Sequence, residues 1–81
     1  MDSIALHILS PEKTLVEQTV ELVTLPGIVS PFTVLKDHGT LITALTAGEI
    51  RYVSSGREEK LSIREGFAEV RDNKVIACVE V

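Results

Sequence analysis

The central stretch of the sequence runs from Pro26 to Gly48 and reads PGIVSPFTVLKDHGTLITALTAG. It contains two short apolar runs, Phe32–Leu35 and Leu41–Leu45, which are too short for stable helices and rich in residues that favour strands. The Lys36–Gly39 segment between them predicts a polar turn in which the glycine takes a positive φ. A second constrained loop, Pro26–Pro31, precedes the first run. We expect the two loops to lie close together and to form a docking edge.

The segments on either side of this stretch also follow strand patterns. Met1–Leu9 is apolar on both faces, which indicates an internal strand or one covered by a partner. In Thr14–Leu25, the face that starts with Glu17 changes from polar to apolar, so we expect a long bent strand that passes from one sheet to another. After the central stretch, strand-like alternation returns in Glu49–Val53, Arg57–Ile63, Phe67–Arg71 and Val75–Val81.

Turn signals separate these segments, at Ser10–Lys13, Ser54–Gly56 and Asp72–Lys74 among other places. A helix over Glu17–Val23 is the alternative to a strand there, and the β-branched residues of that segment argue against it. The pattern therefore predicts an all-β, antiparallel sandwich or barrel of about eight to ten short strands. All 81 residues are expected to form one small domain.

Composition excludes several classes of function. The net charge is -4 and the Lys and Arg residues are scattered, which argues against binding to nucleic acid. No apolar run approaches the ~20 residues of a membrane-spanning helix, so we expect no direct insertion into the bilayer. Cys78 is the only cysteine and lies in an apolar run, so it is expected to be a buried small hydrophobic residue.

The usual residue patterns of enzymes and cofactor sites are missing from the sequence. The two histidines, His7 and His38, are far apart and neither has a second ligand at the spacing of a metal site. There is no glycine-rich phosphate loop and no Gly-x-Ser-x-Gly nucleophile motif. We therefore expect no catalytic residue, no metal site and no cofactor. A small hydrolase that uses Asp37 and His38 is a competing hypothesis, but adjacent residues of a turn usually point apart, so a solvated or partner-facing turn is preferred.

The amount of apolar sequence exceeds what one small interior needs. Several predicted strands are apolar on both faces, and a sandwich of this size has a single core. Outward-facing aliphatic residues mark protein interfaces. The sequence therefore indicates an obligate subunit or a binding module. A free-standing β-sandwich that binds a protein or a small ligand is the alternative, although only 4% of the residues are aromatic, which is few for a ligand pocket.

The order and spacing of several short segments carry a family likeness. These segments are Leu9–Leu15, Val23–Gly27, Phe32–Leu35 with His38 and Leu41–Leu45, Gly48–Tyr52, Gly66–Val70 and Asn73–Val75. The ordered set closely resembles the N-terminal domain of the epsilon subunit of F-type ATP synthase, which is called delta in mitochondria. The likeness covers nearly the whole chain, and its specificity lies in the set rather than in any one segment.

This resemblance implies a flattened antiparallel β-sandwich in the central stalk of a rotary motor. The implied role is a non-catalytic rotor subunit that links the gamma subunit to the membrane ring and couples proton or sodium transport to ATP synthesis. The implied contacts with gamma are Ser10, His38, Gly39, Leu41, Ile42 and Thr43. The implied contacts with the polar loops of the ring subunits are Ile28, Val29, Ser30 and Pro31. The implied location is peripheral, at the cytoplasmic face of the bacterial cell membrane.

The sequence also departs from the family pattern. The family usually has an acidic-glycine turn where this chain has Ile28–Pro31, and proline at the positions of Lys36 and Thr40. Most members continue into a C-terminal pair of helices that binds ATP in some and inhibits hydrolysis by extending along gamma. Nothing follows Val81 in the sequence. The expectation is therefore a subunit that couples the rotor but does not bind ATP or inhibit through such a hairpin.

Overall fold

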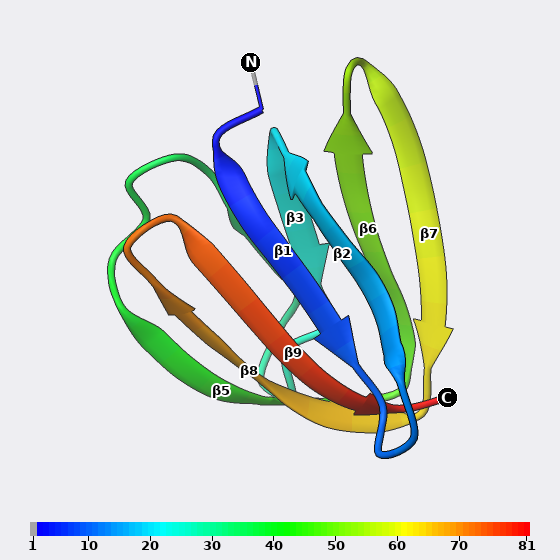
Figure 1. Cartoon of the computed structure of the whole chain (residues 1–81). Coiled ribbons are helices and arrows are strands. Elements are labelled where there is room, and N and C mark those ends of the chain that lie inside the picture. The colour runs from blue at the N-terminus through cyan, green and yellow to red at the C-terminus, as the bar shows by residue number, and fades with distance from the viewer. Residues whose placement is uncertain (1) are drawn as a thin grey trace.

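The computed structural model describes residues 2–81, which form nine strands in two sheets that pack face to face (Figure 1). The molecule measures 29 × 23 × 18 Å along its principal axes, so the sandwich is flattened. The predicted fold class and number of strands are confirmed. The strands are β1 (Ile4–Leu9), β2 (Thr14–Val20), β3 (Leu22–Leu25), β4 (Phe32–Val34), β5 (Leu41–Leu45), β6 (Gly48–Ser54), β7 (Arg57–Ile63), β8 (Glu65–Arg71) and β9 (Lys74–Glu80).

The two sheets interleave along the chain. The five-stranded sheet has the order β2-β1-β9-β8-β5, and the four-stranded sheet has the order β4-β3-β6-β7. The chain therefore changes sheet in four connections, which are β2 to β3, β4 to β5, β5 to β6 and β7 to β8. Every pairing is antiparallel except that of β1 with β9, which is parallel. This one pairing departs from the predicted antiparallel arrangement. It joins the first strand of the chain to the last, next to each other inside the five-stranded sheet.

Alternating residues of the strands fill the space between the sheets. The pattern is clearest in β1 and β9, where every second residue is buried and the others face outward. Among the described residues, no polar or charged residue belongs to the buried set. The hydrophobic core consists of Ile4, Leu6, Ile8, Val20, Val23, Leu25, Val34, Leu45, Ile50, Tyr52, Ile63, Ala68, Val70, Val75, Ala77 and Val79.

The predicted passage of Thr14–Leu25 from one sheet to the other is confirmed. The segment divides into β2 in the five-stranded sheet and β3 in the four-stranded sheet. The break lies at Glu21, whose N–H donates to Val53 O at 2.7 Å. Val20 is buried, and the next buried residue is Val23 rather than Leu22, so the alternation shifts by one residue at the break. An uninterrupted strand would place Val20 and Leu22 on one face, and the break at Glu21 separates them.

The connection Leu35–Thr40 carries the chain from β4 to β5. Its turn is closed by a hydrogen bond from His38 N–H to Leu35 O at 3.1 Å. The residue with positive φ is Asp37, at 64°, and not Gly39 as predicted. Asn73, in the turn between β8 and β9, accounts for this conformation. Its side-chain Oδ1 accepts the Asp37 N–H at 2.6 Å, and its Nδ2 donates to Asp37 Oδ1 at 3.2 Å.

This reciprocal pair of hydrogen bonds supports a testable prediction. Asp37→Ala removes the carboxylate and leaves a β-carbon in the left-handed region, so we expect the free energy of unfolding to fall by about 1–2 kcal/mol. Asp37→Gly also removes the carboxylate but relieves the backbone strain, so its loss should be smaller. Urea unfolding of the two variants measures the difference. Equal stability of Asp37→Ala and the unmodified chain would show that the pair contributes nothing.

Because Tyr52 is buried, we expect the free energy of unfolding to fall at alkaline pH. Burial is the main cause that raises the pKa of its phenol above 10.0, and the Glu59 carboxylate adds to the shift. The folded state therefore favours the neutral phenol. Its contribution to stability is complete below the unfolded-state pKa and is lost as pH rises through the folded-state pKa. In urea unfolding between about pH 8 and pH 11, Tyr52→Phe should lose less stability than the unmodified chain. Identical pH profiles for the two proteins would contradict this expectation.

Candidate docking surfaces

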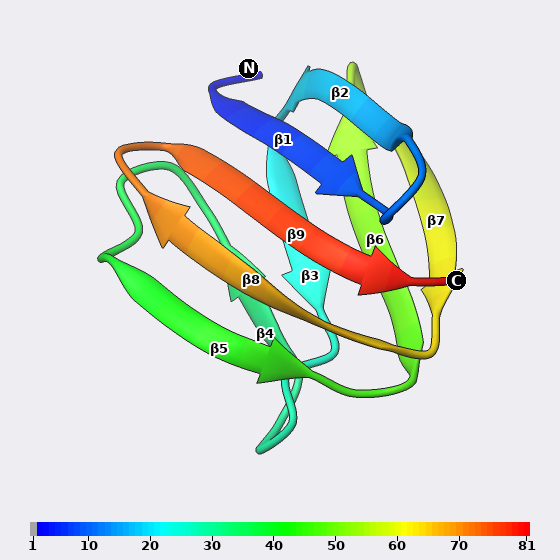
Figure 2. The same ribbon diagram turned by 60° about the horizontal axis from the view of Figure 1, so that its bottom comes forward.

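The two loops of the central stretch do not lie together. They flank β4, which pairs with β3 over its whole length. The loop Pro26–Pro31 therefore lies at one end of β4 and the connection Leu35–Thr40 at the other, as Figure 2 shows at the bottom and at the left. The predicted docking edge formed by both loops is wrong, because β4 and β5 belong to different sheets and do not form a hairpin. Two separate candidate surfaces replace it.

The first candidate surface is the loop Pro26–Pro31, which includes the residues expected to face a membrane ring. It protrudes from the lower end of the sandwich in Figure 2. Its start is fastened to the end of β5 by two hydrogen bonds, from Ile28 N–H to Ala44 O at 3.0 Å and from Thr46 N–H to Pro26 O at 2.9 Å. Ile28, Val29, Ser30 and Pro31 are all exposed. The four residues thus share one fixed, solvent-facing loop, and their contact with a ring stays a prediction.

The second candidate surface contains most of the residues expected to face gamma. Leu41, Ile42 and Thr43 lie on β5, an edge strand of the five-stranded sheet. Ile42 is 70% exposed. His38 and Gly39 precede this strand, and a hydrogen bond joins His38 Nδ1 to Gly39 O at 2.7 Å. Leu41 and Thr43 pair with buried residues of β8 and face the interior side, whereas Ile42 faces outward. The contact of these five residues with gamma also stays a prediction.

Ser10 does not join this group. It lies in the turn between β1 and β2, where its Oγ accepts the Lys13 N–H at 3.2 Å and donates to Lys13 O at 3.1 Å. Two strands, β9 and β8, separate β1 from β5. The register places Leu9, beside Ser10, level with Ala44 and not with the start of β5. Ser10 and His38 are therefore at opposite corners of the five-stranded sheet.

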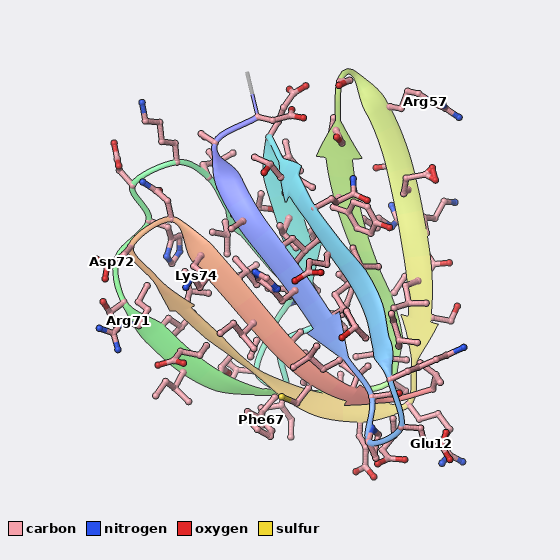
Figure 3. The ribbon with its side chains drawn as sticks, in the orientation of Figure 1. Glu12, Arg57, Phe67, Arg71, Asp72 and Lys74 are labelled. Carbon is pink, nitrogen blue, oxygen red and sulfur yellow. The ribbon has the colours of Figure 1, made fainter. Side chains whose placement is uncertain are left out.

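The outer face of the five-stranded sheet carries an apolar row that leads from Leu9, beside Ser10, to Ala44 near the end of β5. Cross-strand pairing aligns Ala44, Phe67, Cys78 and Leu9. Phe67 is 55% exposed and projects from β8 away from the other sheet (Figure 3). Cys78 is half-buried in this row, so the expectation of a fully buried cysteine is wrong. An open groove of about 550 Å³ lies at one end of the row, between Pro11 and Phe67.

The next row on the same face is mixed. It aligns Ile42, Glu69, Ile76, His7 and Glu17 across the sheet. His7 is half-buried, and its Nδ1 lies 3.5 Å from Glu17 Oε2. Sequence analysis did not include Phe67 or Ile76 among the site residues. Ile76 belongs to the second apolar face of β9, which the sequence does show. The outward face of β8 that carries Phe67 otherwise consists of charged residues, so no apolar pattern identifies Phe67.

The outer face of the four-stranded sheet is polar. Thr24 and Thr33 face each other across β3 and β4 with a hydroxyl–hydroxyl hydrogen bond of 3.0 Å. On β6, the Arg51 guanidinium donates to Glu49 Oε1 at 3.1 Å. Lys60 lies opposite Arg51 on β7 and is exposed. Of the large apolar side chains that are exposed, Ile42 and Phe67 lie on the five-stranded sheet, Ile28 and Val29 lie on the loop Pro26–Pro31, and Leu35 and Val81 lie outside the strands. The paired Leu22 and Val53 are half-buried on the otherwise polar face of the four-stranded sheet.

The described part of the chain offers no arrangement for catalysis at Asp37 and His38. The Asp37 carboxylate is hydrogen-bonded to Asn73 Nδ2, and the His38 ring is bonded to the Gly39 carbonyl, so neither orients the other. Within residues 2–81, no group of three or more His, Cys, Asp or Glu side chains is placed to hold a metal ion. The same residues form no helix that could cross a membrane.

A flattened β-sandwich with an apolar row on one outer face, a mostly polar opposite face and a protruding apolar loop is typical of a small protein-docking domain. The family model for the ATP synthase delta/epsilon chain, β-sandwich domain, matches residues 3–81, so the chain belongs to this family. It is 37% identical over 75 residues to the ATP synthase epsilon chain of Carboxydothermus hydrogenoformans, an alignment covering 93% of this chain and 56% of the relative. It is 40% identical over 70 residues to the ATP synthase epsilon chain of Desulfitobacterium hafniense strain DSM 10664 / DCB-2. That alignment covers 86% of this chain and 53% of the relative. The chain thus spans little more than half the length of these curated relatives.

Solved structures share the fold. A chain in the cryo-EM structure of the Euglena gracilis mitochondrial ATP synthase, with OSCP, F1 and c-ring in rotational state 1, matches with a TM-score of 0.89 and 21% identity. That match covers 98% of this chain and 51% of the other. A chain from the cryo-EM structure of the central stalk and c-ring of the Tetrahymena thermophila mitochondrial ATP synthase matches with a TM-score of 0.82 and 12% identity. That match covers 98% of this chain and 64% of the other.

Proposed function

We propose that this chain is a non-catalytic subunit of the central stalk of an F-type ATP synthase. In this role it links the gamma subunit to the extramembrane loops of the membrane ring, so that ion transport through the ring is coupled to ATP synthesis. The chain would be peripheral to the membrane, at its cytoplasmic face in a bacterium. Family membership supports the assignment to this complex.

The observation that carries the proposal is the asymmetry of the apolar surface. A monomeric domain gains nothing from exposing Ile42 and Phe67 on one outer face while the opposite face is polar, whereas a subunit docked through that face would bury them. The side that would meet gamma includes His38, Gly39, Leu41, Ile42 and Thr43 on and before β5. Ser10, at the far corner of the same sheet, would contact gamma only if gamma also extends across this face.

Co-expression with the gamma subunit encoded in the same genome tests the proposal. We expect the two chains to co-purify and Ile42→Asp to weaken the complex at least about tenfold, because a carboxylate would be buried without a partner. Thr33→Asp introduces the same charge on the polar outer face, at β4, and should leave the dissociation constant unchanged. Failure of the unmodified chain to bind gamma would contradict the proposal.

A further inference from the structure

The connection Leu35–Thr40 has little to hold it in place on its own. Its residues are exposed except for His38, which is half-buried, so the segment gains little from packing. One backbone hydrogen bond, from His38 N–H to Leu35 O, closes its turn. Within residues 2–81, only the Asn73 side chain joins Lys36–Gly39 to another part of the chain by hydrogen bonds. The position of this connection therefore depends on a residue that is distant in the sequence.

Asn73 itself is firmly placed. It lies in the tight turn between β8 and β9, where Asp72 and Asn73 take positive φ angles of 50° and 58°. Its backbone O accepts the Ala5 N–H at 2.9 Å, so β1 also fastens the turn. Figures 1 and 2 both show this turn beside the connection from β4 to β5. The Asn73 side chain thus extends from a fixed end of the five-stranded sheet to the exposed connection.

The chemistry of the Asp37–Asn73 pair is specific. Asn73 Oδ1 accepts the Asp37 N–H at 2.6 Å, and Asn73 Nδ2 donates to Asp37 Oδ1 at 3.2 Å. A carboxylate can only accept hydrogen bonds, so Asp37 needs a donor opposite it, which the asparagine amide supplies. The pair also holds Asp37 at a φ of 64°, where most residues other than glycine are disfavoured. The direction in which the chain leaves Asp37 towards His38 and β5 is therefore fixed.

We propose that Asn73 is a positioning residue, which acts through Asp37 to fix the segment His38–Leu41 in the arrangement that gamma would meet. This inference rests on the proposed function and adds to its gamma contact a residue that need not touch gamma. A segment that is ordered before docking loses less conformational entropy on binding. The Asp37–Asn73 pair would thus strengthen binding without a contact to the partner.

Asn73→Asp tests the inference with almost no change of shape. Asparagine and aspartate both tolerate the positive φ of this turn. The substitution removes the Nδ2 donor and sets two carboxylates against each other, so we expect the pair to open. The dissociation constant for the gamma subunit encoded in the same genome should rise about tenfold. In hydrogen exchange, the amides of Asp37 and His38 should exchange at least about tenfold faster.

A second substitution provides the rescue. Asp37→Asn combined with Asn73→Asp keeps the net charge of -4 and exchanges the donor and acceptor roles of the two side chains. This double variant should bind gamma within about threefold of the unmodified chain. Asp37→Asn alone should also bind within about threefold, because Asn73 Nδ2 can donate to the new amide oxygen.

The outcomes that contradict the inference can be told apart from failure of the proposed function. If the unmodified chain does not bind gamma, the proposed function fails and the inference fails with it. If the unmodified chain binds gamma and Asn73→Asp binds equally tightly, the pair does not position the segment, while the stalk role stands. If the double variant binds as weakly as Asn73→Asp, the loss comes from the new charge at residue 73 and not from the pair. Displaced NMR signals throughout β1 and β9 in Asn73→Asp would show that the whole sheet depends on Asn73, which also contradicts the inference.

Discussion

Leu6→Ala is expected to lower the free energy of unfolding by about 2–5 kcal/mol. Leu6 has no exposed surface and lies at the middle of β1, between Gln18 on β2 and Val75 on β9. The substitution removes buried carbon and leaves a cavity between two sheets whose backbones are fixed by hydrogen bonds. Because domains are stabilised by only about 5–15 kcal/mol in total, a large share of the stability would be lost. The midpoint of urea unfolding measures the change.

Ile42→Ala is the matched control for this prediction. Ile42 is on a strand of the same sheet but is 70% exposed, so little buried surface is removed. Its free energy of unfolding should change by less than about 1 kcal/mol. A comparable loss of stability in the two variants would mean that Leu6 does not occupy the core or that Ile42 is not on the surface.

Gly66→Ala is expected to destabilise the fold by about 2–3 kcal/mol through overpacking. A β-carbon at Gly66 would overlap Cys78 O and lie 3.0 Å from Val79 Cα, both in the backbone of β9. Backbone atoms cannot rotate away as the end of a side chain can, so β8 and β9 would have to separate at this point. The measurement is again urea unfolding, with proton NMR to show local displacement of the β9 amides.

The chain contains its own control for this substitution. No atom lies within 4 Å of the β-carbon position of Gly39, and its φ is not in the left-handed region. Gly39→Ala should therefore leave the stability unchanged or raise it by about 0.4–1 kcal/mol, because alanine restricts the unfolded chain. If Gly66→Ala proved as stable as Gly39→Ala, the close contact between β8 and β9 would be wrong.

Most of the strands and turns could be predicted from the sequence, because each depends on residues that are close together in the chain. Alternation of apolar residues identified β1, β6, β7, β8 and β9 within a few residues of their observed bounds. Two-residue turns with positive φ at Ser55–Gly56 and Asp72–Asn73 correspond to the polar turn signals. The parallel pairing of β1 with β9 was not accessible, because it joins the two ends of the chain and no local pattern records it.

The candidate site was predictable in part for the same reason. The segment from His38 to Thr43 and the exposed loop Ile28–Pro31 are both local features of the sequence, and their contacts with partners stay predictions. The relation between them was missed, because turn residues do not show that β4 and β5 lie in different sheets. Asp37 took the positive φ expected of Gly39 because Asn73, 36 residues away, supplies its hydrogen-bond partners.

The four crossings between the sheets have a mechanical consequence. Two sheets held only by side-chain packing can slide over each other under a sideways load, since apolar contacts have no preferred direction. In this fold each sheet is also joined to the other by covalent backbone at β2–β3, β4–β5, β5–β6 and β7–β8, so shear would stretch several links at once. The domain should therefore deform as one stiff block and transmit a twisting force from one face to its loops with little internal slip.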